Sequence, residues 1–434
     1  MFEPAITRVK DWGDGSLYLI DLPQELRGYH HFISSWAIKT ETGNLLVDVG
    51  PAATIPLLRQ ALKDLEINRV DYVLLTHIHI DHAGGTGLLL ETFPQARVVC
   101  HPPSQRHLLD PARLWQGSLE VLGEVAVKYG PINPVPDGRL AETAPDVKVI
   151  SAPGHAPHHL AFLYRDCLFA GEAGGVYFDV GEVYLRPATP PTFLLPVAMA
   201  TLDRLLAFNL EGCTICYGHY GWASSAARML ERHRGQLLLW DEVIPRVAGK
   251  RPGRSDGDKE LISAVWKELE GSDELFARFY LLPADIQERE RYFITNSIKG
   301  FLGYLLSGPG DQGANGPGHN QEYEGRNPGL GQEQRPGGGY LSGSGPQTHW
   351  HGSQGEKAAE GSHKAALWPR GKEPGQGQQG EQHQNCVQVH LHPGIGQAAQ
   401  EHPQQVGGQE GEQAQQQEES KRDRPALIHG REHH

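Results

Sequence analysis

A cluster of three histidines and one aspartate within six residues restricts the fold of this chain more than any other feature of its sequence. His77, His79, Asp81 and His82 stand at the end of a hydrophobic run, residues 69–77, with the pattern of a buried β-strand. Residues i and i+2 of an extended segment share a face, so the first two histidines can reach one ion; the other two ligands can reach a second ion as the chain turns. Imidazole nitrogens suit zinc and iron, and carboxylates join them on such metals. The fold must therefore present this strand end outside the core.

Three further candidate ligands follow in chain order, each at the end of a predicted strand. They are His155 in SAPGHAPHHLAF, Glu172 in LFAGEAGG and His219 in CYGHYG. A run of polar residues that binds nothing is the alternative for the first cluster, but it does not account for three more ligands in order. The neighbouring His158 and His159 are predicted to support ligands rather than to bind metal.

The order HxHxDH, PGH, an acidic residue after FAG and a final GH resembles the metallo-β-lactamase superfamily, in particular its glyoxalase II and lactonase branch, over about residues 15–225. The resemblance implies an α/β fold, an αββα sandwich with the metals at one edge between its two sheets. Asp48 also matches an aspartate that ends an early strand in this family, and it is expected to hold a ligand or the motif loop. The implied ligands are His77, His79 and His155 on one metal, Asp81, His82 and His219 on the other, and Glu172 between them.

Glu172 is where the sequence departs from the family, which usually has aspartate at this position. The extra methylene moves the carboxylate by roughly 1.5 Å, one carbon–carbon bond. The carboxylate can still bridge two ions if its loop retreats, and the glycines after it favour that. A mononuclear site, a different metal preference and a surface position for Glu172 are the alternatives.

Hydrophobic patterns predict mixed α/β layers followed by helices. Strands are predicted at residues 16–22, 31–40, 44–50, 69–77, 96–101, 146–155, 159–166, 167–172 and 213–219. Helices are predicted at 52–67, 103–130 with an interruption near Pro111, 196–210 and throughout 223–305.

Composition divides the chain near residue 307. Of its 53 glycines, 26 lie in the last 127 residues, among many Gln, Pro and His and without apolar periodicity. Such a segment buries too little apolar surface to offset chain entropy, so residues 308–434 are predicted to be a disordered low-complexity tail. A functional tail and a non-selected extension are both compatible with this pattern. The predicted domains are a metallo-β-lactamase-like domain at 1–222 and a helical extension at 223–307.

Charge and cysteine content narrow the class of partner. A net charge of −13 gives no support for a general nucleic-acid binder, which normally carries a basic face. Cys213 and Cys216 form a single CxxC among five cysteines, which predicts neither a disulfide framework nor a structural zinc site. No signal-peptide pattern and no run of 18 apolar residues is present, so a cytoplasmic protein without membrane association is expected. The expected partner is a small-molecule substrate; the oligomeric state is open.

The sequence has no competing nucleophile, neither a GxSxG elbow nor a recognisable catalytic cysteine. A metal-bound hydroxide is the expected attacking group, since two close cations acidify bound water and polarise a carbonyl or phosphoryl oxygen. Asp81 is the predicted catalytic residue, orienting the hydroxide while it binds metal. Zinc, at two ions per chain, is the expected cofactor, with iron or manganese as alternatives.

The predicted function is hydrolysis of an ester, thioester or lactone of a small metabolite, by analogy with the resembling branch. A lactamase-like nuclease and an iron-dependent dioxygenase on the same fold are the alternatives. The helical extension is expected to cap the metal cleft, with 103–130 as a second flap; completing the core or forming a dimer face is the other interpretation. No basic set for a glutathione carboxylate can be assigned, because ordinary amphipathic helices are expected to carry Arg232, Arg234, Arg289 and Arg291.

Overall fold

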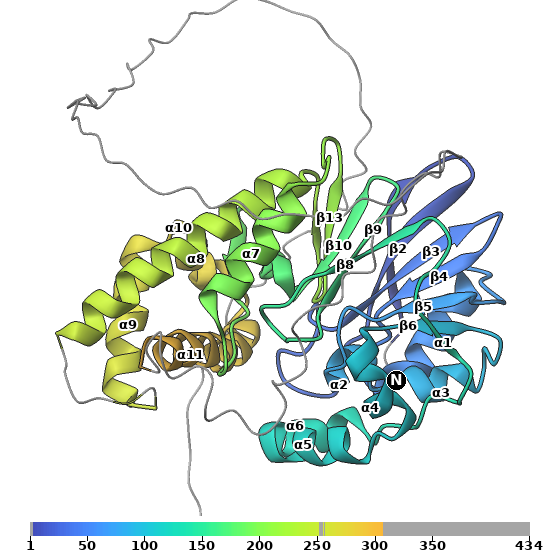
Figure 1. Ribbon diagram of the computed structural model, residues 1–434, viewed down its shortest axis with the longest axis horizontal. Coiled ribbons are helices and arrows are strands. Elements are labelled where there is room, and N and C mark those ends of the chain that lie inside the picture. The colour runs from blue at the N-terminus through green and yellow to red at the C-terminus, as the bar shows by residue number, and fades with distance from the viewer. Residues whose placement is uncertain (1–2, 251–254, 256, 307–434) are drawn as a thin grey trace, which may run out of the picture. The chain divides into compact units, whose positions relative to one another are not determined.

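The computed structural model describes residues 3–250, 255 and 257–306 (Figure 1). The predicted disordered tail, residues 308–434, lies outside the described residues. Residue 307, the last of the predicted helical extension, lies outside them as well.

The first sheet has seven strands that follow one another in chain order. Its first four strands form an antiparallel meander, and its last four pair in parallel. Parallel pairing brings the carboxyl ends of neighbouring strands to one edge of the sheet. The strands are β1 (Ala5–Asp11), β2 (Gly15–Asp21), β3 (Ser34–Thr40), β4 (Asn44–Val47), β5 (Tyr72–Leu74), β6 (Arg97–Val99) and β7 (Leu140–Ala141).

The strand predicted at 69–77 is much shorter in the structure, since β5 ends at Leu74. Beyond it, the Leu75 amide still donates to the Val99 carbonyl at 2.9 Å, but the Thr76 amide donates to the Asp48 carboxylate at 2.8 Å. A side-chain acceptor thus replaces the sheet at this point, and the chain leaves the sheet one residue before His77. Strand β1 was not among the strands predicted from the sequence.

The second sheet has five strands in the order β14-β13-β10-β9-β8. Strands β10 and β13 are parallel, and the other neighbours are antiparallel. Its strands are β8 (Val147–Ser151), β9 (Leu160–Tyr164), β10 (Cys167–Gly171), β13 (Thr214–Tyr217) and β14 (Trp222–Ala223). A separate hairpin, which the sequence analysis missed, is formed by β11 (Val176–Asp179) and β12 (Val183–Arg186).

The two sheets face each other across a shared apolar layer. Leu17 and Leu74 of the first sheet belong to the same buried cluster as Phe162 and Phe169 of the second. The Trp36 ring meets the Phe169 ring edge-on at 5.9 Å, and the indole of Trp36 donates to the Tyr217 carbonyl at 3.0 Å. This sheet-on-sheet core is the centre of the predicted αββα sandwich.

Helices cover the outer face of the first sheet. In α1 (Ile55–Asp64) the apolar residues recur at helical spacing, and Ile55, Leu58 and Leu62 are fully buried with the outward-facing side chains of the sheet. The short α3 (Thr86–Leu90) joins the same cluster. Helices α4 (Gln105–Leu109), α5 (Ala112–Leu122) and α6 (Glu124–Tyr129) occupy the segment predicted as helical at 103–130, with the expected break at Pro111.

A second helical layer covers the outer face of the other sheet. Its largest buried side chains, Trp240, Phe276 and Phe301, belong to one cluster with Leu168 and Ile215 of the sheet. The predicted helical character of the C-terminal region is therefore confirmed. The layer contains α7 (Leu195–Leu206), α8 (Ala226–Gly249), α9 (Lys259–Ser272), α10 (Glu274–Ala277), the 3-10 turn η4 (Arg278–Leu281) and α11 (Ala284–Leu306). Among the described residues, no helix is both long and apolar enough to cross a membrane.

Candidate metal centre

The segment between β5 and α2 (Ile80–Ala83) carries the HxHxDH motif and is anchored by Asp48. The Asp48 carboxylate accepts hydrogen bonds from the Thr76 amide at 2.8 Å and from the Thr76 hydroxyl at 2.7 Å. Asp48 follows β4 and has a φ of 52°, which turns its side chain out of the strand direction. This buried aspartate holds the motif loop, as the sequence analysis expected of it.

The remaining predicted ligands come from the second sheet. His155 follows β8, Glu172 lies in the 3-10 turn η3 (Glu172–Gly174) directly after β10, and His219 follows β13. Because β10 and β13 are parallel, Glu172 and His219 leave the sheet at the same edge. Strand topology therefore brings together residues that are far apart in the sequence.

Three imidazole nitrogens meet on one side of Glu172. His79 Nδ1 lies 2.9 Å from His77 Nε2 and 3.1 Å from His155 Nε2. One oxygen of Glu172, Oε2, lies 3.2 Å from the His77 nitrogen and 3.3 Å from the His155 nitrogen. Ligands of one tetrahedral zinc ion, with bonds of about 2.0–2.1 Å, are roughly 3.3 Å apart. These separations fit donors that share an ion.

A second group lies on the other side of the same carboxylate. Glu172 Oε1 lies 3.0 Å from His219 Nε2, and His82 Nε2 lies 3.6 Å from both Asp81 Oδ2 and Glu172 Oε2. The donor atoms of Asp81, His82 and His219 all lie within 4.8 Å of one another. The structure thus brings all seven predicted ligands into two adjoining groups, with Glu172 between them. The alternative of a surface position for Glu172 is wrong, because its side chain is only 6% exposed.

Hydrogen bonds on the outer nitrogens orient four of these histidines. In each, Nδ1 contacts a fixed acceptor or hydroxyl, and Nε2 is left to face the centre. The contacts are Thr76 Oγ1 to His77 at 3.1 Å, Asp48 Oδ2 to His82 at 3.1 Å, the Ala188 carbonyl to His155 at 2.9 Å and the Phe32 carbonyl to His219 at 3.3 Å.

Two buried polar atoms at the centre have no hydrogen-bond partner: Nε2 of His82 and Oε2 of Glu172. Burying a polar atom without a hydrogen bond destabilises the fold, unless the atom binds something else, such as a metal ion. Histidine and carboxylate donors at these separations match the ligand types of zinc, iron and manganese. The residues present therefore fit a divalent metal site.

Electrostatics favour neutral imidazoles on one side and a cation on the other. Burial, followed by the neighbouring His155, lowers the pKa of His79 to about 4, and burial also places the pKa of His77 well below its usual range. Burial opposes charge on His82 too, but the carboxylates of Asp81, Asp48 and Glu172 outweigh it and raise its pKa to about 10. Burial would raise the pKa of Glu172, yet the surrounding imidazoles hold it well below its usual range. The carboxylates thus attract positive charge to this position.

His159 supports the centre without belonging to either ligand group. Its Nε2 accepts a hydrogen bond from the Glu172 amide at 3.2 Å, and its ring stacks on His77 at 5.2 Å. Gly171, with a φ of 54°, makes this approach possible, since a Cβ there would lie 2.4 Å from His159 Nε2. His158 is likewise absent from the candidate ligand groups found among the described residues.

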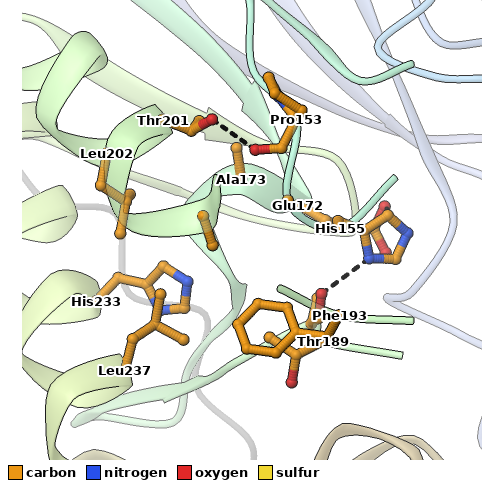
Figure 2. A pocket seen from close by; sticks show the side chains of 13 residues that line it. Pro153, His155, Glu172, Ala173, Thr189, Phe193, Thr201, Leu202, His233 and Leu237 are labelled. Carbon is orange, nitrogen blue, oxygen red and sulfur yellow. Dashed lines mark hydrogen bonds and ion pairs between the residues drawn. The ribbon is translucent and has the colours of Figure 1, made fainter. Parts of the chain in front are cut away.

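A small cavity borders the centre on one side. Figure 2 shows His155 and Glu172 on one side of it, with Phe193, His233 and Leu237 among the other residues of its wall. Its volume of about 20 Å³ leaves room for roughly one water molecule. Of the ligands in the two groups, Asp81 has the most exposed carboxylate, at 18%. Asp81 is thus the more accessible of the two carboxylates of the centre.

Arg289 is a correction to the sequence analysis, which expected it in an ordinary amphipathic helix. Arg289 is only 4% exposed, and its guanidinium carbon lies 4.0 Å from the centre of the Phe32 ring. That ring stacks in turn on the His219 imidazole at 4.2 Å and an interplanar angle of 6°. The sequence gives a signal only for the next residue, Glu290, which falls on the apolar stripe of Ile286 and Ile294; no pattern marks Arg289 itself.

Comparisons with known proteins match this arrangement. The family model described as the metallo-beta-lactamase superfamily matches residues 28–219, a range that includes all seven predicted ligands. A metallo-beta-lactamase fold-containing protein, ST1585, of Sulfurisphaera tokodaii is 27% identical over 234 residues, which are 50% of this chain and 87% of that protein. The crystal structure of ST1585, reported from Sulfolobus tokodaii, is 22% identical with a TM-score of 0.46, covering 65% of this chain and 97% of that one.

A hydroxyacylglutathione hydrolase of Xylella fastidiosa is another relative. It is 31% identical over 193 residues, which are 44% of this chain. The match spans 61% of that hydrolase, less than two thirds of its length.

Proposed function

The chain belongs to the metallo-β-lactamase superfamily, and from this premise we propose that it is a hydrolase that cleaves an ester, thioester or lactone of a small metabolite at a centre of two divalent ions. The family match and the hydroxyacylglutathione hydrolase relatives support the hydrolase class. The number of ions, their identity as zinc and the substrate class are parts of the proposal.

The observation that carries the proposal is the position of the Glu172 carboxylate. One of its oxygens faces His77 and His155, and the other faces His219 at 3.0 Å. The geometry supports a bridging role despite the longer side chain. Oε1 contacts the second group through His219, whereas Oε2 contacts the first group and also lies 3.6 Å from His82 Nε2 of the second. The unpartnered Nε2 of His82 supplies a further donor to the second group.

The chain's own residues would prepare the centre and guide the substrate. Bound divalent ions supply Lewis acidity, which acidifies a water molecule and polarises a substrate carbonyl. Asp48 accepts the hydrogen bond from His82 Nδ1 and so keeps Nε2 free as a donor atom. Asp81 is the more exposed of the two proposed ligand carboxylates, and we propose that it orients the attacking water. The proton that this water releases can pass to solvent there.

The surroundings of Asp81 favour a substrate with an apolar acyl part. Ile80, next to it in the chain, is buried in one cluster with Tyr129 of α6, and Tyr29 and Trp115 pack against that cluster. We propose that the apolar acyl group of an ester or thioester, rather than a phosphodiester, packs against the partly buried side chains of this cluster. Relatives named hydroxyacylglutathione hydrolase support a thioester as one of the candidate substrates.

The proposal is tested by metal analysis followed by activity measurements. Elemental analysis of the full chain after mild purification or reconstitution should find close to two ions per chain. A value that stays near zero after reconstitution contradicts the metal site, and a value near one contradicts bridging by Glu172. The loaded protein is then offered a thioester, a lactone, a carboxyl ester, a phosphodiester and RNA, and turnover of the last two only would overturn the proposed substrate class.

Replacing a ligand separates the site from the rest of the fold. His79→Ala or Asp81→Ala should reduce turnover of any accepted substrate at least tenfold while circular dichroism stays unchanged, because both residues lie at the edge of the sandwich rather than in its core. Glu211→Gln, an exposed carboxylate far along the chain, is the matched control. Activity above about a tenth of the parent in the ligand variants would place the reaction elsewhere.

A further inference from the structure

A groove with a volume of about 620 Å³ lies between α9 and α11 and is lined in part by η4. Ligand pockets for small molecules typically have volumes of about 300–1,000 Å³. The groove is lined by four cations, Lys259, Lys267, Arg291 and Lys299, and by the aromatic side chains of Trp266 and Tyr280.

This groove is distinct from the metal centre. None of the seven ligands lines it, and in the view of Figure 1 α11 lies between α9 and α2, the helix of the HxHxDH motif. Consecutive residues of α11 show that this helix has two different faces. Glu290 is fully buried, whereas Arg291 is exposed and lines the groove. The inference below therefore does not rest on the proposed function.

The four cations of the groove lack acidic partners within the part of the chain that the structure describes. Other arginines of the same helical layer are paired: Arg234 with Asp203 at 2.7 Å, and Arg246 with Glu268 at 3.0 Å. The one carboxylate of the groove, Glu270, accepts hydrogen bonds from the Trp266 indole at 2.5 Å and from the Tyr280 hydroxyl. In a chain with a net charge of −13, this groove gathers four cations around a single carboxylate.

The groove is aromatic at one end. The Arg291 guanidinium lies 5.7 Å from the centre of the Trp266 ring, and Tyr280 joins Trp266 through the shared Glu270 oxygen. Arg291, Thr295 and Lys299 line the groove at intervals of four residues. Eight residues of helix rise about 12 Å, so Lys299 lies about that far along α11 from the aromatic end.

We propose that this groove binds a nucleotide, with its base against Trp266 and Tyr280 and its phosphates against Lys299 at the other end. Aromatic side chains stack on nucleobases of any kind, and lysine ammonium groups bind phosphate as point charges. A separation of about 12 Å between the aromatic end and Lys299 matches the length of a nucleoside diphosphate better than that of a single phosphate ion. Thr295, between the two ends, offers a hydroxyl to the ribose or phosphate.

The test is calorimetric titration of the metal-loaded full chain with adenosine diphosphate, adenosine and pyrophosphate. Adenosine diphosphate should bind at least tenfold more tightly than either fragment, because it alone contacts both ends of the groove. Its affinity should fall as salt is raised. No binding at millimolar adenosine diphosphate overturns the proposal, as does equal binding of pyrophosphate, which would indicate a phosphate site.

Variants locate the binding and exclude the metal centre as its source. Lys299→Gln and Trp266→Leu should each weaken adenosine diphosphate about tenfold, with unchanged metal content and hydrolase activity. Lys63→Gln, on α1 of the other helical layer, is the matched control and should bind as the parent does. Binding that survives both groove variants, or tighter binding of a single-stranded oligonucleotide than of adenosine diphosphate, would refute the assignment.

Discussion

Glu172 and Glu290 are both buried glutamates with pKa values below the usual range, but their oxygens have different partners. Both oxygens of Glu290 accept hydrogen bonds: Oε2 from the Arg186 guanidinium and from the Tyr184 hydroxyl at 3.2 Å, and Oε1 from Arg289 at 3.2 Å. Glu172 faces imidazoles, and its Oε2 accepts no hydrogen bond.

The difference separates a structural carboxylate, Glu290, from the proposed ligand carboxylate, Glu172. A buried charge whose lone pairs are all satisfied needs nothing further, so Glu290 is explained by joining α11 to β12. A buried charge with an unsatisfied oxygen at the centre of a histidine cluster is explained by a cation that binds there. Substitutions at the two positions should therefore affect different properties.

Glu290→Gln should have the largest effect on stability. It removes the negative charge between two buried arginines, and breaking a buried pair in this way costs about 3–5 kcal/mol. The melting temperature should fall by about 10 °C for a domain of this size. Glu288→Gln is the matched control, because Glu288 lies on the same helix but is 64% exposed and pairs with Arg27 only at the surface, 3.2 Å away. Equal melting temperatures for the two variants would show that the buried cluster does not stabilise the helical layer.

Glu172→Gln should affect metal binding and turnover much more than stability. The amide removes the charge that attracts a cation, so metal content should fall by about one ion per chain and turnover by about 100-fold, or about 2.7 kcal/mol. The metal-free protein should melt within about 3 °C of the parent, since glutamine has nearly the same shape and its amide can still hydrogen-bond the His219 imidazole. Plasma emission spectrometry and melting curves after chelation test both parts. Normal metal content in this variant would mean that Glu172 is not a ligand.

Acid pH should weaken the fold through Glu290 in a predictable window. Burial alone would raise its pKa, but Arg186 and Arg289 outweigh burial and lower it to about 2, with a smaller contribution from His219; Tyr184 also contacts the carboxylate. A carboxyl that binds its proton more weakly in the folded chain stabilises the fold above the unfolded pKa, about 4.5. This contribution is lost as pH falls from about 4.5 towards 2. Urea unfolding of chelated protein at pH 5 and pH 3 should show a smaller pH dependence in Glu290→Gln than in the parent.

The contrast also explains which parts of the site the sequence predicts. The proposed ligands can be found because each group follows a hydrophobic strand, and parallel strands such as β10 and β13 bring their carboxyl ends together. Local spacing and strand order therefore carry enough information to predict the donors around Glu172. Asp48, at the end of β4, belongs to the same class.

The Glu290 cluster could not be predicted in the same way. Glu290 meets Arg186 across 104 positions of sequence, and nothing near either residue specifies its partner. The amphipathic pattern of α11 even misplaces Arg289, because a helical period assigns charged residues to the solvent side. Thr76 and Phe32 were missed for a related reason, since the Thr76 hydroxyl contacts His77 and the Phe32 carbonyl and ring contact His219 without any motif that marks them.

The smallest predicted effect is at Phe32, which connects the two carboxylate environments. Its ring packs against the Arg289 guanidinium at 4.0 Å and against the His219 imidazole at 4.2 Å, while its carbonyl lies 3.3 Å from His219 Nδ1. Phe32→Leu keeps the carbonyl and removes the planar surface that fixes the imidazole. The affinity of the second ion should fall by about five- to tenfold, and the first ion should be unaffected.

Cobalt substitution followed by absorption spectroscopy resolves the two sites, because the visible bands depend on the ligand geometry of each ion. Phe32→Tyr, which keeps the aromatic face, should restore the parent affinity, whereas a loss of general packing would leave it impaired. Arg289→Lys should lie between the two, since a lysine retains the cation over the ring but not the planar guanidinium contact. If Phe32→Leu weakens both ions equally, the ring stabilises the fold as a whole and does not position His219.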